Sequence, residues 1–489
     1  MRPRTSPARV LAACLVAASA PALAPSASGA VVPASCPPGI PQADRARVDC
    51  GHVEVPLRHE VPGSPSIGVY FARVRAATPT HADPVMLLGG GPGEKTAAAT
   101  GAPLTPRAPF RSLAERRDLV VIDQRGVGLS RPALECAELA SAPPTATTVD
   151  VTALLRRCGA RLRSGGVDLG AFSTGQSVRD LDVLRRTLGY ARVNLLGGSY
   201  GARLAQQALR GDPDWVRSVV LTSPVPAEAN FVADGPRTFG RALARTFRLC
   251  AASAACRARY GDLSGTLDGA IRRLQRSPAE VPVTLRGRTV RVPVTATFAA
   301  TVLFASYYSP QGIAQVPRLV ADLGRGRYRA LLSGAGVQTT SGSPVSLGMQ
   351  LSALCQEEGA RLRGSVVRRN RTLAPAPRAL AAGSVVIGEP LRRICRTWGV
   401  PPTAFPTFAP VVSTVPALIV TGQLDQITAP RYGETVARQL PNSTLVEVPG
   451  AGHSALFAAG PCGIRAAAAF LDDPSAPPPV ACLRRGGGR

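Results

Sequence analysis

The G-x-S-x-G stretch from Gly197 to Gly201 constrains this chain most strongly, because it joins an apolar run to a helix-like segment. Residues 193–196 read as a buried strand, and residues 202–210 follow with a helical pattern. Glycines on both sides of Ser199 permit a tight backbone bend that lifts its hydroxyl clear of the sheet. The stretch therefore predicts a nucleophile elbow, with a glycine-rich turn carrying a surface serine as the alternative.

A serine nucleophile needs a base, usually histidine, and a carboxylate that orients this base. His453 is the only one of four histidines that follows the elbow, and chains with this elbow place the acid and then the base after the serine. His453 lies in a glycine-rich loop after a strand-like segment, and Asp425 follows the buried strand expected at residues 417–420. We therefore expect Ser199, Asp425 and His453 to be nucleophile, orienting acid and base.

Acyl transfer also needs backbone N–H donors for the oxyanion, one of them from the residue after the nucleophile. Tyr200 supplies that donor. The glycine run from Gly89 to Gly93 follows another short apolar strand, and its Gly91 N–H is the expected second donor. A phosphate cradle is the alternative for this run, but no G-K-[ST] pattern is present and Glu94 would repel an anion.

The first thirty residues indicate a secretory signal peptide. Three arginines precede an apolar run over residues 10–23, and small residues at 28–30 suggest cleavage near Ala30. Cys14 opens the apolar run instead of closing it, so lipid attachment there is disfavoured. No later segment is expected to span a membrane; the nearest candidate, residues 292–308, is expected to be a buried helix.

Cysteine usage agrees with export. Ten of the eleven cysteines remain once Cys14 is set aside, and an exported chain can oxidise them. Neighbour pairing is expected, although sequence alone does not fix the connectivity. A metal site is the alternative, but no C-x-x-C or Cys/His cluster occurs. The expected pairs are Cys36–Cys50, Cys136–Cys158, Cys250–Cys256, Cys355–Cys395 and Cys462–Cys482.

The formal net charge of +26 raises the possibility of a nucleic-acid or anionic-surface partner. However, the basic residues are arginines scattered through the chain, with Lys95 the only lysine, and this composition is typical of a GC-rich genome. Aromatic residues make up only 4% of the chain and offer few platforms for stacking bases. We therefore expect no nucleic-acid partner.

Strand-like and helix-like segments alternate up to about residue 229, which predicts a mostly parallel sheet covered on both faces. Helical patterns then dominate, and strand-like segments return near residue 415. The expected organisation is a signal peptide at 1–30, an α/β core at 31–229 and 406–489, and an inserted, mainly helical domain at 230–405.

Three motifs together closely resemble the prolyl and tripeptidyl aminopeptidases, which are serine exopeptidases of the α/β-hydrolase fold. The motifs are Gly-Gly-Pro-Gly at 90–93, Asp-Gln-Arg-Gly at 123–126 and Gly-Gly-Ser-Tyr-Gly at 197–201. The region around Asp425, His453 and the cysteine-closed ending is similar to the secreted actinobacterial tripeptidyl branch. Gly89 stands where the family motif often has His, and Glu94-Lys95 is an uncommon continuation of the motif. The resemblance therefore does not assign substrate contacts to this loop.

The same resemblance implies that the insertion forms a cap over the site and that cap carboxylates bind the free amine of a peptide. Acids are sparse in the insertion, so adjacent Glu357 and Glu358 are the candidates. A carboxylate in a partly desolvated pocket suits an ammonium group. A solvated helix face is the alternative for such a pair.

The sequence thus predicts an exported α/β hydrolase that cleaves short peptides from a free N-terminus through an acyl-enzyme on Ser199. No metal or organic cofactor is implied. An esterase or amidase that uses the same triad on a small non-peptide acyl group is the nearest alternative. A catalytically silent binding protein on this fold and a basic surface-binding protein are more distant ones.

Overall fold

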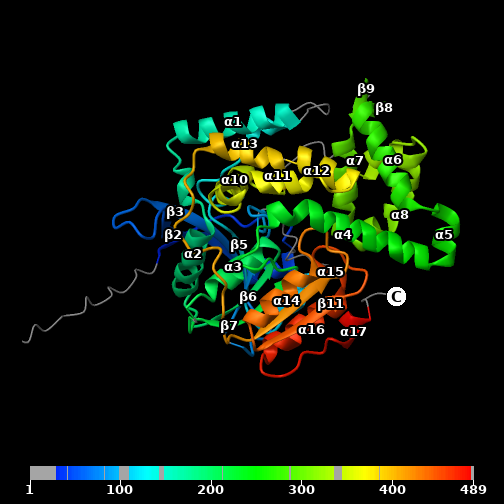
Figure 1. The fold of residues 1–489 in the computed structure, drawn as a ribbon. Coiled ribbons are helices and arrows are strands. Elements are labelled where there is room, and N and C mark those ends of the chain that lie inside the picture. Colours follow the sequence, from blue (N-terminus) through cyan, green and yellow to red (C-terminus); the bar gives the residue numbers. More distant parts are fainter. Residues whose placement is uncertain are drawn as a thin grey trace, which may run out of the picture.

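The elbow lies near the middle of a nine-stranded sheet in the computed structural model (Figure 1). The structure describes residues 29–40, 42–81, 83–97, 109–141, 148–211, 213–285, 288–334, 344–384 and 386–485. Residues 1–28, including Cys14, lie outside the described residues, so the signal peptide stays a prediction. Within the described ranges, every helix is too short or too polar to cross a bilayer.

The sheet is mostly parallel, as the sequence predicts. Its strand order is β1-β2-β3-β5-β4-β6-β7-β10-β11, with antiparallel pairing from β1 to β5 and parallel pairing from β5 to β11. Strand β1 is short and was not expected from the sequence. The strands are β1 Val31–Pro33, β2 Val48–Pro56, β3 Ser66–Val74, β4 Val85–Leu88, β5 Leu119–Asp123, β6 Val193–Gly198, β7 Val216–Thr222, β10 Ala417–Gly422 and β11 Ser443–Val448.

Helices cover both faces of this sheet. Apolar side chains of α2, α3 and α14 pack on one face, and those of α15, α16 and α17 pack on the other. Strands β4 and β5 are buried along their whole length, and β4 and residues 119–122 of β5 are apolar, as expected of strands covered on both faces. The helices are α2 Thr174–Thr187, α3 Tyr200–Ala208, α14 Pro430–Gln439, α15 Ala455–Ala458, α16 Pro461–Asp472 and α17 Ala481–Arg484.

The start of α2 lacks a side-chain cap, although Thr174 and Ser177 are of residue types that often cap helices. Ser173 is the N-cap residue and makes no side-chain cap hydrogen bond. Thr174 is buried, and its hydroxyl bonds Glu357 and Tyr200 instead. The Thr174 side chain therefore makes tertiary hydrogen bonds instead of capping α2.

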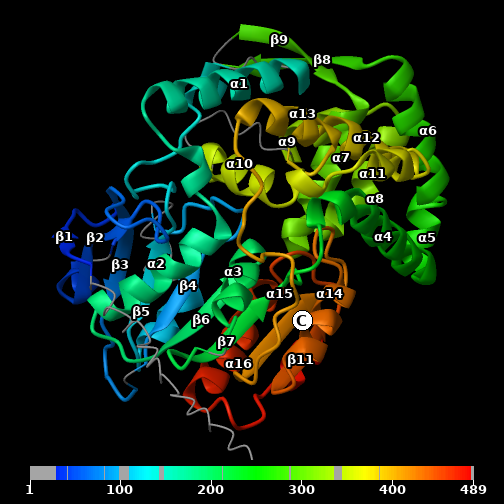
Figure 2. The same cartoon turned by 60° about the vertical axis from the view of Figure 1, so that its left-hand side comes forward.

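A mainly helical layer lies above the sheet in both views, drawn from green to yellow-orange (Figures 1 and 2). It comprises α4 Phe231–Ala252, α5 Ala254–Tyr260, α6 Leu263–Arg276, α7 Ala296–Ala305, α8 Pro310–Gly324, α9 Arg329–Gly334, α10 Leu347–Gln356, α11 Gly364–Asn370, α12 Pro375–Gly383 and α13 Glu389–Trp398. These elements lie between β7 and β10 in the chain, and we refer to them as the cap. The domain boundaries at 229/230 and 405/406 stay a prediction.

Two features of the cap region were not expected. Strands β8 Ala279–Leu285 and β9 Arg288–Val294 form an antiparallel hairpin. Residues 292–294, expected to begin a buried helix, belong to β9, because Thr295 is the N-cap residue of α7 and starts the helix after them. In addition, α1 Thr148–Ser164 precedes the cap in sequence but lies beside α13, where Arg163 donates to Trp398 O at 2.6 Å.

Disulfides join the five neighbouring cysteine pairs that the sequence suggested. Two of them, Cys250–Cys256 and Cys355–Cys395, lie within the cap and close segments of 6 and 40 residues. The Cys355–Cys395 bond ties the end of α10 to α13. It therefore braces the cap next to the Glu357–Glu358 pair.

Candidate active site

Ser199 occupies a strained turn between β6 and α3. Its φ and ψ are 56° and −118°, a conformation that L-residues other than glycine rarely adopt. The flanking glycines permit the turn, because a Cβ on Gly197 would lie 2.3 Å from Gly201 O and a Cβ on Gly201 would lie 2.2 Å from Leu88 O. The expected nucleophile elbow is thus present in its backbone geometry.

Asp425 and His453 meet through a buried hydrogen bond. His453 Nδ1 lies 2.9 Å from Asp425 Oδ2 and 3.1 Å from Oδ1. Asp425 also accepts from the backbone N–H groups of Ile427 and Thr428 and from the Thr428 hydroxyl. Burial alone would raise the pKa of Asp425, but the charge and hydrogen bond of His453 and the bonds from Thr428 hold it below its ordinary value.

The loop that carries His453 rests on the end of β7. Ser454 N–H donates to Ser223 Oγ, and Leu456 N–H donates to Thr222 Oγ1. The same Thr222 accepts at its carbonyl oxygen from Ser199 N–H, at 3.0 Å. One strand end therefore supports both the elbow and the histidine loop.

Ser199 Oγ makes no cap hydrogen bond within α3. A hydrogen bond between Ser199 Oγ and His453 is likewise not formed among the described residues. Such bonds are often long in enzymes without substrate and tighten only when substrate is bound. The described geometry therefore places Ser199 and the Asp425–His453 pair at the same edge of the sheet, without a hydrogen bond between Ser199 Oγ and the imidazole.

The glycine loop after β4 approaches the same serine. A Cβ on Gly90 would lie only 3.5 Å from Ser199 Cβ. Gly91 has a φ of +103°, and Gln124 Nε2 donates to Gly89 O at 2.9 Å, which holds the start of the loop. Tyr200, the other expected oxyanion donor, is the first residue of α3. Both expected donors thus belong to segments that adjoin Ser199.

Glu357 and Glu358 are buried, each with 1% of its surface exposed. Glu357 accepts from the Thr174 N–H at 2.9 Å and from the Thr174 hydroxyl at 2.8 Å, while Glu358 forms an ion pair with buried Arg203. Burial, and then the charge of Glu358, raise the pKa of Glu357 to about 7. In this structure both carboxylates are occupied by protein partners, and the solvated-face alternative does not describe them.

Three side chains at the site were missed by sequence reasoning. Thr428, three residues after Asp425, bonds its carboxylate, and a turn of this kind after an Asp is a usable local signal. Tyr308 places its ring edge-on to the His453 imidazole, with centroids 5.4 Å apart. Arg203 on α3 is the partner of Glu358. Tyr308 and Arg203 gave no local signal, because their roles depend on the cap.

A second His–Asp pair, formed by partly buried His59 and buried Asp180, lies outside the site. His59 Nε2 is 2.8 Å from Asp180 Oδ1, and Arg125 binds both carboxylate oxygens of the same Asp180. Arg125 also donates to the carbonyl oxygens of Leu57 and Ala171. The Asp-Gln-Arg-Gly motif thus supplies a buried arginine that joins β2, β5 and α2.

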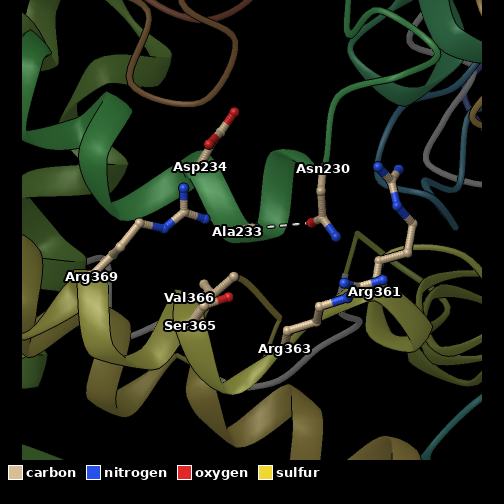
Figure 3. Close-up of a pocket in the computed structure, with 8 residues that line it drawn as sticks. All are labelled: Asn230, Ala233, Asp234, Arg361, Arg363, Ser365, Val366 and Arg369. Carbon is tan, nitrogen blue, oxygen red and sulfur yellow. Dashed lines mark hydrogen bonds between the residues drawn. The ribbon is translucent and has the colours of Figure 1, made fainter.

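A cavity of about 210 Å³ opens where the start of α4 faces α11 (Figure 3). Arginines dominate its lining, and the triad residues are not part of it. Its lining residues are Asn230, Ala233, Asp234, Arg361, Arg363, Ser365, Val366 and Arg369. Asp234 is engaged by the Tyr432 hydroxyl at 2.6 Å. The cavity is therefore a feature of the cap and not of the candidate catalytic centre.

One group of potential metal ligands occurs among the described residues, formed by Cys136, Glu138 and Cys158. The two sulfurs are joined in a disulfide, and Glu138 pairs with Arg161. Thiolate is the form of cysteine that binds metals, so this group does not suit one.

Comparisons with known proteins agree with this geometry. Residues 83–459 match the sequence model of the alpha/beta hydrolase fold family. Serine protease Hip1 of Mycobacterium tuberculosis is 26% identical over 463 residues, which cover 88% of this chain and 86% of the relative. Tripeptidyl aminopeptidase of Streptomyces coelicolor is 31% identical over 193 residues, which cover 36% of this chain and 35% of the relative.

Among solved structures, proline iminopeptidase of Mycobacterium smegmatis is 16% identical with a TM-score of 0.40, and the match covers 87% of this chain and 98% of that one. The family model covers most of the chain, including the elbow, Asp425 and His453. This protein belongs to the alpha/beta hydrolase fold family and is a hydrolase of that fold.

Proposed function

We propose that this protein is an exported serine exopeptidase that cleaves short peptides from a free N-terminus through an acyl-enzyme on Ser199. The observation that carries the proposal is the 2.9 Å contact between His453 Nδ1 and Asp425 Oδ2 at the sheet edge that holds the elbow. An imidazole held through Nδ1 by a buried carboxylate leaves Nε2 available for the serine proton.

In the proposed reaction, Ser199 Oγ attacks the scissile carbonyl carbon while its proton passes to His453 Nε2. The N–H groups of Gly91 and Tyr200 stabilise the oxyanion, and Asp425 stabilises the imidazolium. The C–N bond then breaks as His453 protonates the leaving amine. Water, deprotonated by His453, attacks the acyl-enzyme ester, and the proton returns to Ser199 as the acid product leaves.

Support for a peptide substrate comes from the relatives, whose names are serine protease and tripeptidyl aminopeptidase. The proposed role of Glu357 and Glu358 in binding the substrate amine requires that the amine compete with Thr174 and Arg203. Support for export comes from the five disulfides, since such bonds persist mainly in oxidising compartments.

The first test is Ser199→Ala in the full chain, assayed on peptide anilides with a free amine. Removing a serine nucleophile of this kind lowers kcat by about a million-fold, so we expect activity near background. A folded variant with wild-type activity would overturn the assignment of Ser199. Circular dichroism of both proteins supplies the control for folding.

The second test compares the wild-type protein on free-amine peptides, the same peptides with acetylated amines, and a panel of small esters. An exopeptidase acting at the N-terminus should strongly prefer the free amine. Equal cleavage of free and acetylated peptides would exclude aminopeptidase action. Turnover of esters with no cleavage of any peptide would identify an esterase instead.

A further inference from the structure

Glu94 places a carboxylate beside the candidate nucleophile. Gly90 N–H donates to Glu94 Oε2 at 2.6 Å. A Cβ added to Gly90 would lie 3.0 Å from this oxygen and 3.5 Å from Ser199 Cβ. The carboxylate and the serine thus adjoin the same point of the oxyanion loop.

The loop holds Glu94 there by bonds on both sides. Lys95 N–H donates to Pro344 O, and Ser346 N–H donates to Gly93 O. The neighbouring Lys95 does not neutralise Glu94, because its Nζ lies 3.0 Å from Glu135 Oε2. Among the described residues, the Gly90 N–H is the only hydrogen-bond donor to the Glu94 carboxylate, and no ion pair engages it.

Tyr308 lies near both the Glu94 carboxylate and the His453 ring. Its side chain keeps 51% of its surface exposed and contacts the His453 ring edge-on. Desolvation by the surrounding protein, and then the negative charges of Asp425 and Glu94, raise the pKa of its hydroxyl. Glu94 and Tyr308 therefore both lie close to the candidate catalytic centre.

An uncompensated carboxylate next to an oxyanion hole works against acyl transfer, because it repels the negative charge that develops on the substrate oxygen. A positive charge on the substrate would cancel this repulsion. The α-ammonium group of the residue whose carbonyl is attacked suits this place, since its nitrogen lies about 2.5 Å from that carbonyl carbon. The amine of a tripeptidyl group can lie roughly 7 Å farther away.

We propose that Glu94 binds the α-ammonium of the residue that acylates Ser199, so that the enzyme removes single N-terminal residues. The inference rests on the proposed exopeptidase function. Glu94 is exposed, whereas Glu357 and Glu358 are buried and occupied by Thr174 and Arg203. Glu94 is therefore a specificity residue that requires a cationic substrate close to the scissile bond.

The variant Glu94→Gln tests this role, because its amide oxygen can still accept from Gly90 N–H while the charge is lost. The substrates are alanyl p-nitroanilide, its N-acetyl derivative and trialanyl p-nitroanilide. We expect kcat/KM for alanyl p-nitroanilide to fall by about tenfold to a hundredfold, and kcat for the N-acetyl derivative to rise by a few-fold.

Glu115→Gln is the matched control, since Glu115 is exposed and precedes β5, at the end of the sheet opposite the elbow. It should leave both rates unchanged. Labelling of Ser199 by a neutral fluorophosphonate verifies that each variant is folded. Effects of the same sign and size on both substrates would show that Glu94 only shapes the loop, and so overturn the proposal.

Two further outcomes separate this proposal from the proposed function. If the wild-type protein prefers trialanyl p-nitroanilide and Glu94→Gln leaves that preference intact, single-residue removal is wrong while exopeptidase action stands. If the wild-type protein cleaves the N-acetyl derivative as fast as the free-amine substrates, both proposals fail.

Discussion

Two histidine–aspartate pairs of almost equal length have different surroundings in this molecule. His453 and Asp425 lie 2.9 Å apart, and His59 and Asp180 lie 2.8 Å apart. The distances alone do not distinguish the two pairs. The other hydrogen-bond partners of each carboxylate distinguish them.

Asp180 receives Arg125 on both oxygens in addition to His59. Its negative charge is therefore already balanced by a guanidinium that is always protonated. Among the described residues, the donors to Asp425 besides His453 are neutral, namely two backbone N–H groups and the Thr428 hydroxyl. Of the two carboxylates, Asp425 is the one with no arginine bound to it in the described part of the chain, so its charge suits it to stabilise an imidazolium.

The largest expected contrast is in turnover. Asp425→Asn should lower kcat by about ten-thousand-fold, because the imidazole loses its orientation and the partner of its positive charge. Asp180→Asn should keep kcat within about tenfold, since this pair lies outside the site. Steady-state assays on the same free-amine substrate give both values. A similar loss in the two variants would contradict the distinction drawn from Arg125.

For stability, Asp180→Asn should have the larger effect and Asp425→Asn the smaller. Asp180→Asn leaves the fully buried Arg125 without its carboxylate, and breaking a buried pair on one side costs about 3–5 kcal/mol. Urea unfolding of the full chain, with disulfides intact, measures this loss. Asp425→Asn, whose main partner can become neutral, should cost less. An unchanged midpoint for Asp180→Asn would mean that Arg125 finds other acceptors.

Glu357 is a buried carboxylate whose oxygens accept from Thr174 and, within the described ranges, from no cation; it gives the smallest expected effect. Its pKa is raised from 4.5 to about 7, so the folded state keeps this proton longer than the unfolded state does. The free energy of unfolding should therefore fall as pH rises from 4.5 to about 7. Glu357→Gln should remove that part of the slope, and Glu115→Gln should not.

One outcome would contradict the predicted pH dependence. A Glu357→Gln variant whose unfolding free energy retains the wild-type slope would mean that Glu357 is ionised in both states. Its burial would then be offset by partners other than Thr174. Chemical unfolding at several pH values measures the slope in each protein.

The sequence predicted the elbow, the parallel strands and the disulfide pairs because each leaves a local signal. Within β7, Val219, Val220 and Leu221 are consecutive apolar residues, because this strand is buried on both faces. Asp425 and His453 could be selected because each follows such a strand. The proposed catalytic roles of the triad stay predictions, although the structure brings its segments together.

Other features depend on tertiary contacts and could not be predicted. Thr174 is a residue type that often caps a helix N-terminus, but its hydroxyl donates to Glu357, which belongs to the inserted helical domain. Tyr308 reaches His453 only because the cap folds over the sheet. The β8–β9 hairpin is different, because apolar residues alternate along both strands; it had a local signal that the expectation of a mainly helical domain passed over. The contacts of Thr174 and Tyr308 involve residues far away in the sequence, so local sequence patterns do not predict them.

The position of the cap between β7 and β10 orders events during synthesis. The strand that carries Ser199 and its neighbours β4 and β7 precede the cap, whereas Asp425 and His453 follow it. Pairing of Val220 with Leu418 must close a very long loop, which is intrinsically slow. A nascent chain thus holds Ser199 long before it has His453, so the proposed reaction of these two residues cannot begin until the last strands are in place.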